Sequence, residues 1–344
     1  MISKIVIKKI RISSILMMIA LIGFMKPSAT LAYPIIDMVF NVWRVISVGI
    51  ILGLILYEKV HISKASHYIA LFQVYLMGIT ILNRGDTIQA IINGLTIIGE
   101  VFLFEYAVKK NFKYFLEVIC RVLVLYICVN QITLYLFPEG LLTTDRGAPI
   151  YFLGIHNRFI FWILPALCYL CIKSYIEFNK ISLLIYIIHF VCIVTFWERN
   201  AAGATIGCLM FSAFFILISK RKIRIADYRM YILLYFILWF TLSFFDSLDF
   251  WSWLTYGIFE KKGSLVVRIN MWETAKRFWL EDSIHFLFGY GREFDLKILT
   301  KFPYIHVHNN LLNVAYQGGI VGGMLYFSPF FIIRKSLKIC YFGM

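Results

Sequence analysis

The sequence contains few charged residues: Asp, Glu, Lys and Arg make up 15% of its 344 residues, whereas hydrophobic residues make up 61%. Soluble domains carry about a quarter charged residues, because a polar surface must cover their core. This shortage excludes a soluble globular protein. The sequence also lacks repeats and low-complexity linkers. We therefore expect a single integral membrane domain over residues 1–344.

Carboxylates and accessible cysteines are also scarce. No DxD-like carboxylate pair is present: Asp246 and Asp249 are three residues apart, and Asp37 stands alone in its loop. We therefore expect no obligatory metal and no cofactor. All seven cysteines fall in apolar windows or near the C-terminus, which argues against an outer disulfide. Cys168 and Cys171 form a CxxC, but inside an apolar helix this spacing favours packing over metal binding.

Long apolar runs are abundant instead. A membrane-spanning helix needs about 20 apolar residues. Windows of this kind occur ten times, at 12–31, 35–57, 66–82, 87–108, 114–137, 159–175, 181–197, 201–219, 230–245 and 310–333. The sequence therefore predicts an all-α, polytopic integral membrane protein of about ten transmembrane helices, with a large loop at 246–309 before the last helix.

The first window has two interpretations. Basic residues precede it, and Thr30-Leu31-Ala32 resembles the small-residue cleavage site of a signal peptide. We favour a retained first helix, because many further apolar windows follow it.

The net charge of +15 raises the question of nucleic-acid binding, but the distribution of the charge answers it. If the loops alternate between the two sides, nineteen Lys and Arg residues fall on the side of the N-terminus. The short loops of the other side hold five. This asymmetry follows the positive-inside rule. It predicts cytoplasmic termini, an extracytoplasmic 246–309 loop and no nucleic-acid partner.

Two of the short outer loops carry clustered polar side chains. Loop 138–158 contains Arg146, His156, Asn157 and Arg158, a density that suits an anionic, hydroxyl-rich ligand. Arg199 lies in a very short turn between two apolar windows, near the membrane interface. The alternative for these loops is ordinary solvation.

The large outer loop contains an amphipathic segment. Arg268, Trp272 and Trp279 lie in it with apolar residues at helical spacing, which predicts an interfacial helix along the outer leaflet. A turn containing Gly289 and Gly291 follows.

The last apolar window has a polar mouth. His306, His308 and Asn309 stand immediately before it. A helix N-terminus there favours an anion such as phosphate, and a simple polar cap is the alternative.

In this order and on this side of the membrane, the motifs resemble those of the bacterial O-antigen polymerase and O-antigen ligase superfamily. The matching residues are Arg146 with Leu153-Gly154-Ile155-His156-Asn157, then Arg199, Arg268 and Trp272, Gly289 and Gly291, and His308-Asn309 with Gly319 and Gly322. Two features depart from the pattern. Glu198 replaces a frequent serine, and one predicted helix follows the loop where relatives have about two more, so we expect a shortened C-terminal end.

The resemblance implies a metal-independent glycosyltransferase in the bacterial cytoplasmic (inner) membrane. It would polymerise undecaprenyl-pyrophosphate-linked oligosaccharide repeat units into a surface polysaccharide: capsule, exopolysaccharide or O-antigen. Transfer to another acceptor, as by an O-antigen ligase, is one alternative, and a lipid-linked oligosaccharide flippase is another. Membrane lipid is an expected partner, and a flippase and a chain-length regulator protein are further candidates.

The resemblance also implies roles for residues. Arg199 and Arg268, with Arg146, would grip the pyrophosphate through planar guanidinium forks. His308 would accept the proton of the attacking hydroxyl, because neutral imidazole is a suitable base. His306 and His156 are alternatives for that role. Together with Asn157 and Asn309, they are otherwise expected to contact pyrophosphate or glycan.

Overall fold

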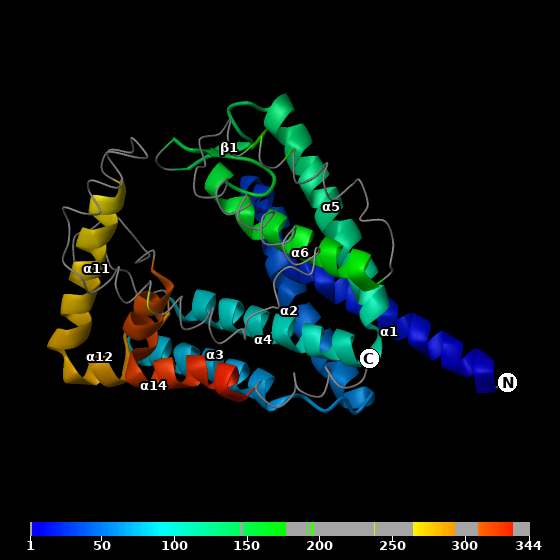
Figure 1. Cartoon of the computed structure of the whole chain (residues 1–344), viewed down its shortest axis with the longest axis horizontal. Helices are drawn as coiled ribbons and strands as arrows, with labels where there is room; N and C mark the ends of the chain where they lie inside the picture. Colours follow the sequence, from blue (N-terminus) through cyan, green and yellow to red (C-terminus); the bar gives the residue numbers. More distant parts are fainter. Residues whose placement is uncertain are drawn as a thin grey trace, which may run out of the picture. The chain divides into compact units, whose positions relative to one another are not determined.

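The structure is a computed structural model that describes residues 2–144, 147–176, 191, 194–195, 237, 264–292 and 309–332. The elements in chain order are α1 (Ile2–Phe24), η1 (Ser28–Ala32), α2 (Pro34–Tyr57), α3 (Lys64–Leu82), α4 (Thr87–Lys110), α5 (Phe112–Leu136), β1 (Leu142–Thr143), β2 (Pro149–Ile150), η2 (His156–Arg158), α6 (Ile160–Ile176), α11 (Ser264–Glu281), α12 (Ser283–Phe288) and α14 (Asn310–Ile332) (Figure 1). The prediction of a mainly helical chain is confirmed for these ranges, since β1 and β2 form only a two-residue antiparallel pair.

Hydropathy located most of these helices well. The ends of α2, α3, α4, α5 and α6 lie within two residues of the predicted windows. In the part of the chain that the structure describes, α2, α3 and α4 are long and apolar enough to cross a membrane. The predicted number of about ten is not confirmed. Window 201–219 lies outside the described residues, and windows 181–197 and 230–245 lie almost wholly outside them.

The first predicted window, 12–31, was misplaced. Helix α1 begins at Ile2 and ends at Phe24. Proline lacks a backbone N–H and disfavours helix in the residue before it, so Lys26-Pro27 stops the helix. Beyond it, the Lys26 ammonium lies 2.5 Å from a carboxylate oxygen of Asp37 in the first turn of α2.

By their internal contacts the residues divide into two compact units, and one of the boundaries along the chain falls within α4. Unit 1 comprises residues 1–61 and 102–225. In it α1 packs against α2 and α5, and α5 packs against α6. Helices α1 and α2 approach closely at Gly23, where a Cβ atom would lie 2.2 Å from Ser47 Oγ. The close approach therefore depends on the absence of a side chain at residue 23.

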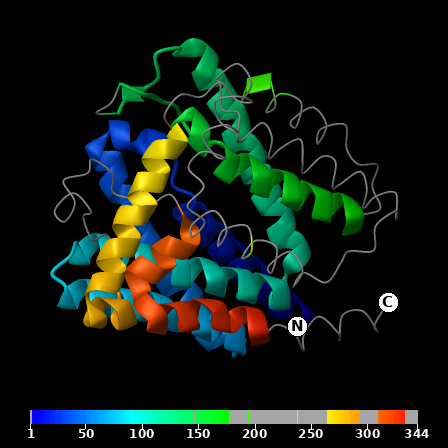
Figure 2. The same ribbon diagram turned by 60° about the vertical axis from the view of Figure 1, so that its left-hand side comes forward.

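Unit 2 comprises residues 62–101 and 226–344. Here α14 packs along α3 and also contacts α11 and α12 (Figure 2). Two apolar clusters hold these helices together. One contains Trp272, Ala275, Tyr290, Leu312 and Tyr316, and the other contains Phe72, Leu76 and Val314. Helix α14 belongs to both clusters, so it connects the outer-loop helices to α3.

Candidate functional site

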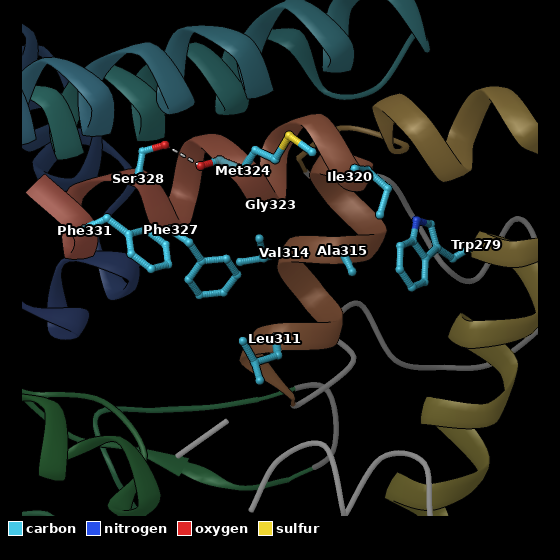
Figure 3. Close-up of a pocket in the computed structure, with 11 residues that line it drawn as sticks. Trp279, Leu311, Val314, Ala315, Ile320, Gly323, Met324, Phe327, Ser328 and Phe331 are labelled. Carbon is cyan, nitrogen blue, oxygen red and sulfur yellow. Dashed lines mark hydrogen bonds between the residues drawn. The ribbon is translucent and has the colours of Figure 1, made fainter. Parts of the chain in front are cut away.

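Helix α14 bends sharply at Gly319 (Figure 3). Gly319 has φ 61° and ψ −162°, a conformation essentially restricted to glycine. The predicted bounds of this helix hold, but the prediction of one continuous spanning helix is wrong. Hydropathy reports which residues are apolar and is blind to a single residue with positive φ.

The turn that contains Gly289 and Gly291 docks onto this bend. The Tyr290 N–H donates to the Tyr316 carbonyl oxygen at 3.0 Å, and the Gly291 N–H donates to the Gln317 carbonyl oxygen at 2.8 Å. Buried backbone groups need partners, and this pairing supplies them. We call the contact of residues 289–291 with residues 316–319 the glycine junction.

Close backbone approach explains two of the glycines. Gly289 has φ +78°, and a Cβ atom there would lie 2.3 Å from the Gln317 carbonyl oxygen. A Cβ atom on Gly319 would lie 2.4 Å from the Leu287 carbonyl oxygen. Both distances are far below van der Waals contact, and positive φ is strained for any residue with a side chain. The two segments therefore meet backbone to backbone.

Two polar side chains, Tyr75 of α3 and Asn83 directly after α3, also bind the glycine junction. The Tyr75 hydroxyl lies 2.7 Å from the Phe288 carbonyl oxygen and 3.0 Å from the Gly318 carbonyl oxygen. Its single proton is shared between the two segments that meet there. The Asn83 amide donates to the Gly289 carbonyl oxygen at 3.2 Å.

Arg292 extends this attachment. Its N–H donates to Thr80 Oγ1 at 2.7 Å, and its guanidinium donates to the buried Gln73 side chain at 2.5 Å. Gly291 packs against the Thr80 backbone, where a Cβ atom would lie 2.6 Å from the Cα atom. The sequence interpretation passed over both α3 and Arg292, because their contacts join positions more than 200 residues apart.

Asn309 caps α14. It is 2% exposed, and its side-chain oxygen accepts the Leu312 N–H at 3.2 Å. Asparagine is among the best helix N-caps, because it satisfies one of the free N–H groups of the first turn. The structure therefore gives Asn309 a helix-capping role, and its contact with a ligand stays a prediction.

Helix α11 runs beside the first half of α14 (Figure 2). Trp272, 4% exposed, belongs to the same cluster as Leu312 and Tyr316 of α14. The backbone of Arg268 lies one turn before Trp272, so the two positions share a face of α11. Unit 2 therefore brings the helix that carries Arg268 against the helix that Asn309 begins.

An unpredicted carboxylate–imidazole pair stands at the corner between α11 and α12. Asp282 caps α12, accepting the Ile284 N–H at 2.9 Å, and its other oxygen bonds to His285 Nδ1. These bonds, that of His285 first, hold the pKa of Asp282 below its ordinary value. The Asp-x-x-His spacing at a helix start was the available sequence signal.

His285 of this pair also belongs to a stack of three rings. The His285 ring lies parallel to Tyr290 at 3.8 Å between centroids, and Tyr290 stacks on Tyr316 at 4.8 Å. Burial raises the pKa of Tyr290 above its ordinary value. The buried Tyr316 hydroxyl has no hydrogen-bond partner among the described residues. The stack fixes the α11–α12 corner on the glycine junction.

The predicted polar loop 138–158 lies in unit 1. Its hairpin, β1 and β2, is followed by η2, which contains His156 and Asn157. Asn130 of α5 holds the loop, since its side-chain oxygen accepts the Leu153 N–H at 2.9 Å. Gly154 allows the turn with φ +115°. The loop is thus anchored on α5, with His156 partly exposed at its end.

Four predicted site residues lie outside the described residues: Arg146, Arg199, His306 and His308. The structure describes the backbone of Arg268 and Asn157 and the side chains of His156 and Asn309. Within the described ranges, no three His, Cys, Asp or Glu side chains gather as they would to hold a metal ion.

An open apolar pocket of about 610 Å³ lies along α14 (Figure 3). Leu311, Val314 and Ala315 line it before the bend, and Ile320, Gly323, Met324 and Phe327 are among the residues that line it after the bend. Trp279 of α11 also borders it. Residues on both sides of the bend therefore line one apolar space. This space begins at the first turn of α14, next to the Asn309 cap.

A family model described as O-antigen ligase matches residues 183–327. This segment contains Arg199, Arg268, the glycine junction and His308-Asn309, and it begins after loop 138–158. The resemblance to the O-antigen polymerase and ligase superfamily is thereby confirmed for this segment. No curated protein and no solved structure matches the chain.

Proposed function

We propose, from the match of residues 183–327 to the O-antigen ligase family, that the chain polymerises undecaprenyl-pyrophosphate-linked oligosaccharides on the outer face of the cytoplasmic membrane. The match is the observation that carries the proposal, because it supports glycan transfer between lipid-linked substrates. The apolar helices α2, α3 and α4 support action within a membrane.

The proposed reaction forms one bond and breaks one. A sugar hydroxyl of the acceptor repeat unit attacks the anomeric carbon of the donor glycan, and the bond from that carbon to pyrophosphate breaks. The lipid pyrophosphate leaves with the bonding electron pair, and the hydroxyl proton passes to a base. Pyrophosphate is a stable leaving group, so the chain must chiefly hold its charge and orient the hydroxyl.

The proposed roles divide by chemistry. Arg199, Arg268 and Arg146 bind pyrophosphate oxygens, because a guanidinium donates two parallel hydrogen bonds. His308 is the proposed base. His156, Asn157, His306 and Asn309 complete the proposed contacts with pyrophosphate and glycan. No metal or cofactor takes part in this proposal.

The glycine junction supports the placement of two of these residues. It fixes α12 and its neighbour α11 against α14, and the cluster of Trp272, Leu312 and Tyr316 keeps the two longer helices side by side. Position 268 and the start of α14 are thereby held in one rigid arrangement. Catalysis by positioning needs such rigidity, because small displacements lower the rate strongly.

Polymer formation is tested with purified protein in liposomes that contain lipid-linked repeat units. A ladder of products supports the polymerase. The family description favours a second candidate, transfer by a ligase, and product on a different acceptor lipid would establish it. Translocation without a new glycosidic bond would overturn both and establish a flippase.

The proposed topology is tested separately. Both termini are placed in the cytoplasm and residues 246–309 outside, in accordance with the positive-inside rule. In a cysteine-free chain, a cysteine at Ser283 should react with an impermeant thiol reagent in intact spheroplasts, and a cysteine at Ser219 should not. The reverse pattern would contradict an outer-face reaction.

A further inference from the structure

The corner between α11 and α12 exposes large apolar side chains. Leu280 is 57% exposed, Ile284 67%, Leu287 44% and Phe288 44%. Ile284, Leu287 and Phe288 follow i, i+3, i+4 spacing, so they share one face of α12. A patch of this kind in an extracytoplasmic loop needs an apolar partner, because water is a poor one.

Helix α12 is tied to a helix that can span the membrane. The carbonyl oxygen of Phe288 is bonded by Tyr75, and that of Gly289 by Asn83, which directly follows α3. Tyr75 stands seven residues before Leu82, the last residue of α3, and so about 10 Å along the helix from its end. The end of α12 is thus held at the last turns of α3, where a spanning helix meets the headgroup region.

The exposed surface of α3 is apolar, like the patch on α12. Leu71 is 50% exposed, Val74 53% and Ile81 49%, as expected for a helix that faces lipid. Trp279, which is at home in the headgroup zone, lies beside α12, where its indole N–H donates to the Phe286 carbonyl oxygen at 3.2 Å.

The backbone N–H groups near the patch have acceptors within the protein, as a medium without water requires. The Gly289 N–H donates to the His285 carbonyl oxygen, the Tyr290 N–H to the Tyr316 carbonyl oxygen, and the Arg292 N–H to Thr80 Oγ1. Irregular backbone is tolerated at membrane depth only where protein groups satisfy it in this way. A solvated surface loop has no such requirement.

We propose that α12 is embedded in the outer leaflet, with Leu280, Ile284, Leu287 and Phe288 among the upper acyl chains of membrane lipids. The partner is the bilayer itself, since the patch sits at the end of a spanning helix and has the chemistry of that helix's exposed surface. The large outer loop is therefore anchored in the membrane at α12.

This anchor has a consequence that rests on the proposed function. Through the glycine junction, α12 holds α11 and the first half of α14 at the level of the lipid headgroups. The pyrophosphate of a lipid-linked glycan lies at that level. The anchor would therefore set the height of Arg268 relative to the phosphates, whereas the lipid contact itself is independent of any reaction.

The test uses the full chain in phosphatidylcholine liposomes, with the native cysteines replaced and a single cysteine labelled with the fluorophore NBD. Labels at Ile284 and Leu287 report on the patch, and a label at the exposed Glu273 of α11 is the control. Lipids with a nitroxide high on the acyl chain should quench the first two labels at least twofold more than the control. Iodide in the water should quench the control more.

Two results would overturn the proposal. Stronger quenching by iodide at residues 284 and 287 would show a patch in water, and protection from both quenchers would show a patch covered by protein. Thermal melting of each labelled variant identifies any that is misfolded. If the Ile284 variant does not fold, the label at Leu287 alone decides the test. Because no reading depends on glycan transfer, failure here is distinguishable from failure of the proposed function.

Discussion

Replacing Gly319 by alanine should disrupt the bend of α14. A side chain at φ 61° and ψ −162° costs on the order of 1–3 kcal/mol in backbone strain. The new Cβ atom would lie 2.4 Å from the Leu287 carbonyl oxygen and 2.6 Å from the Gly289 nitrogen. Relieving this overlap separates the two segments and breaks the hydrogen bonds from Tyr290 and Gly291, each worth about 1 kcal/mol. The expected loss of unfolding free energy is therefore roughly 3–5 kcal/mol.

Gly323 provides a matched control in the same helix. An added Cβ atom there meets nothing within 4 Å, and alanine in a helix is favoured over glycine by about 0.5–1 kcal/mol. Unfolding in mixed micelles with increasing dodecyl sulfate, followed by circular dichroism, measures both variants. Gly319→Ala should unfold at much lower dodecyl sulfate than wild type, and Gly323→Ala at an equal or higher concentration. Equal midpoints for the two variants would refute the role given to the bend.

Four further outcomes are expected. Arg268→Lys should lose most of the ladder in the liposome assay, although charge is retained, because an ammonium cannot grip two phosphate oxygens; a wild-type ladder would remove Arg268 from the pyrophosphate site. His308→Ala should lower the transfer rate by about a hundredfold to ten-thousandfold with normal membrane insertion, and full activity in His308→Asn would exclude a base. Asn309→Ala should cost about 1 kcal/mol of stability through loss of the helix cap, and Asn309→Asp should restore most of it; equal melting of the two variants would contradict the cap. The pKa of Asp282 is lowered in the folded protein. Its ionised carboxylate therefore stabilises the fold fully above the unfolded-state pKa of about 3.9, and the stabilisation is lost as pH falls through the folded-state value. Asp282→Asn should thus melt at a lower temperature than wild type at pH 7, and the same difference at pH 2 would contradict a stabilising role of the charge.

The sequence located helices better than it located the site. Apolar runs near twenty residues fixed α2 to α6, because burial in lipid demands that length of apolar side chains. The same reasoning hid the bend, since Gly319 contributes to hydropathy like any small residue. The family resemblance drew attention to Gly289, Gly291, Gly319 and Gly322 without predicting that any of them meet, and periodicity gave no reason for the glycines at 289, 291 and 319. The reason is a contact between backbones distant in sequence.

Side chains that act at long range were missed altogether. Tyr75 and Thr80 stand inside an apolar window, where a lone polar group gives no local signal of its partner. His285 and Tyr290 lie in the large predicted outer loop, where no local pattern links the two rings. Their alignment depends on Tyr316, which approaches them only because α14 bends. Spacing within one segment cannot predict such a stack.

The shared proton of Tyr75 also sets an order of events in biosynthesis. Its two carbonyl partners are 213 and 243 residues further along the chain. At a synthesis rate of about 5–20 residues per second, roughly 10–50 s separate the emergence of α3 from that of α14. During this interval α3 lies in the membrane, and the later segments that bind Gln73, Tyr75 and Thr80 have not yet been synthesised. The unit around α3 can therefore close only late in synthesis, and an arrest before residue 288 would leave these three side chains without their later partners and open to a chaperone, another helix or the quality-control proteases.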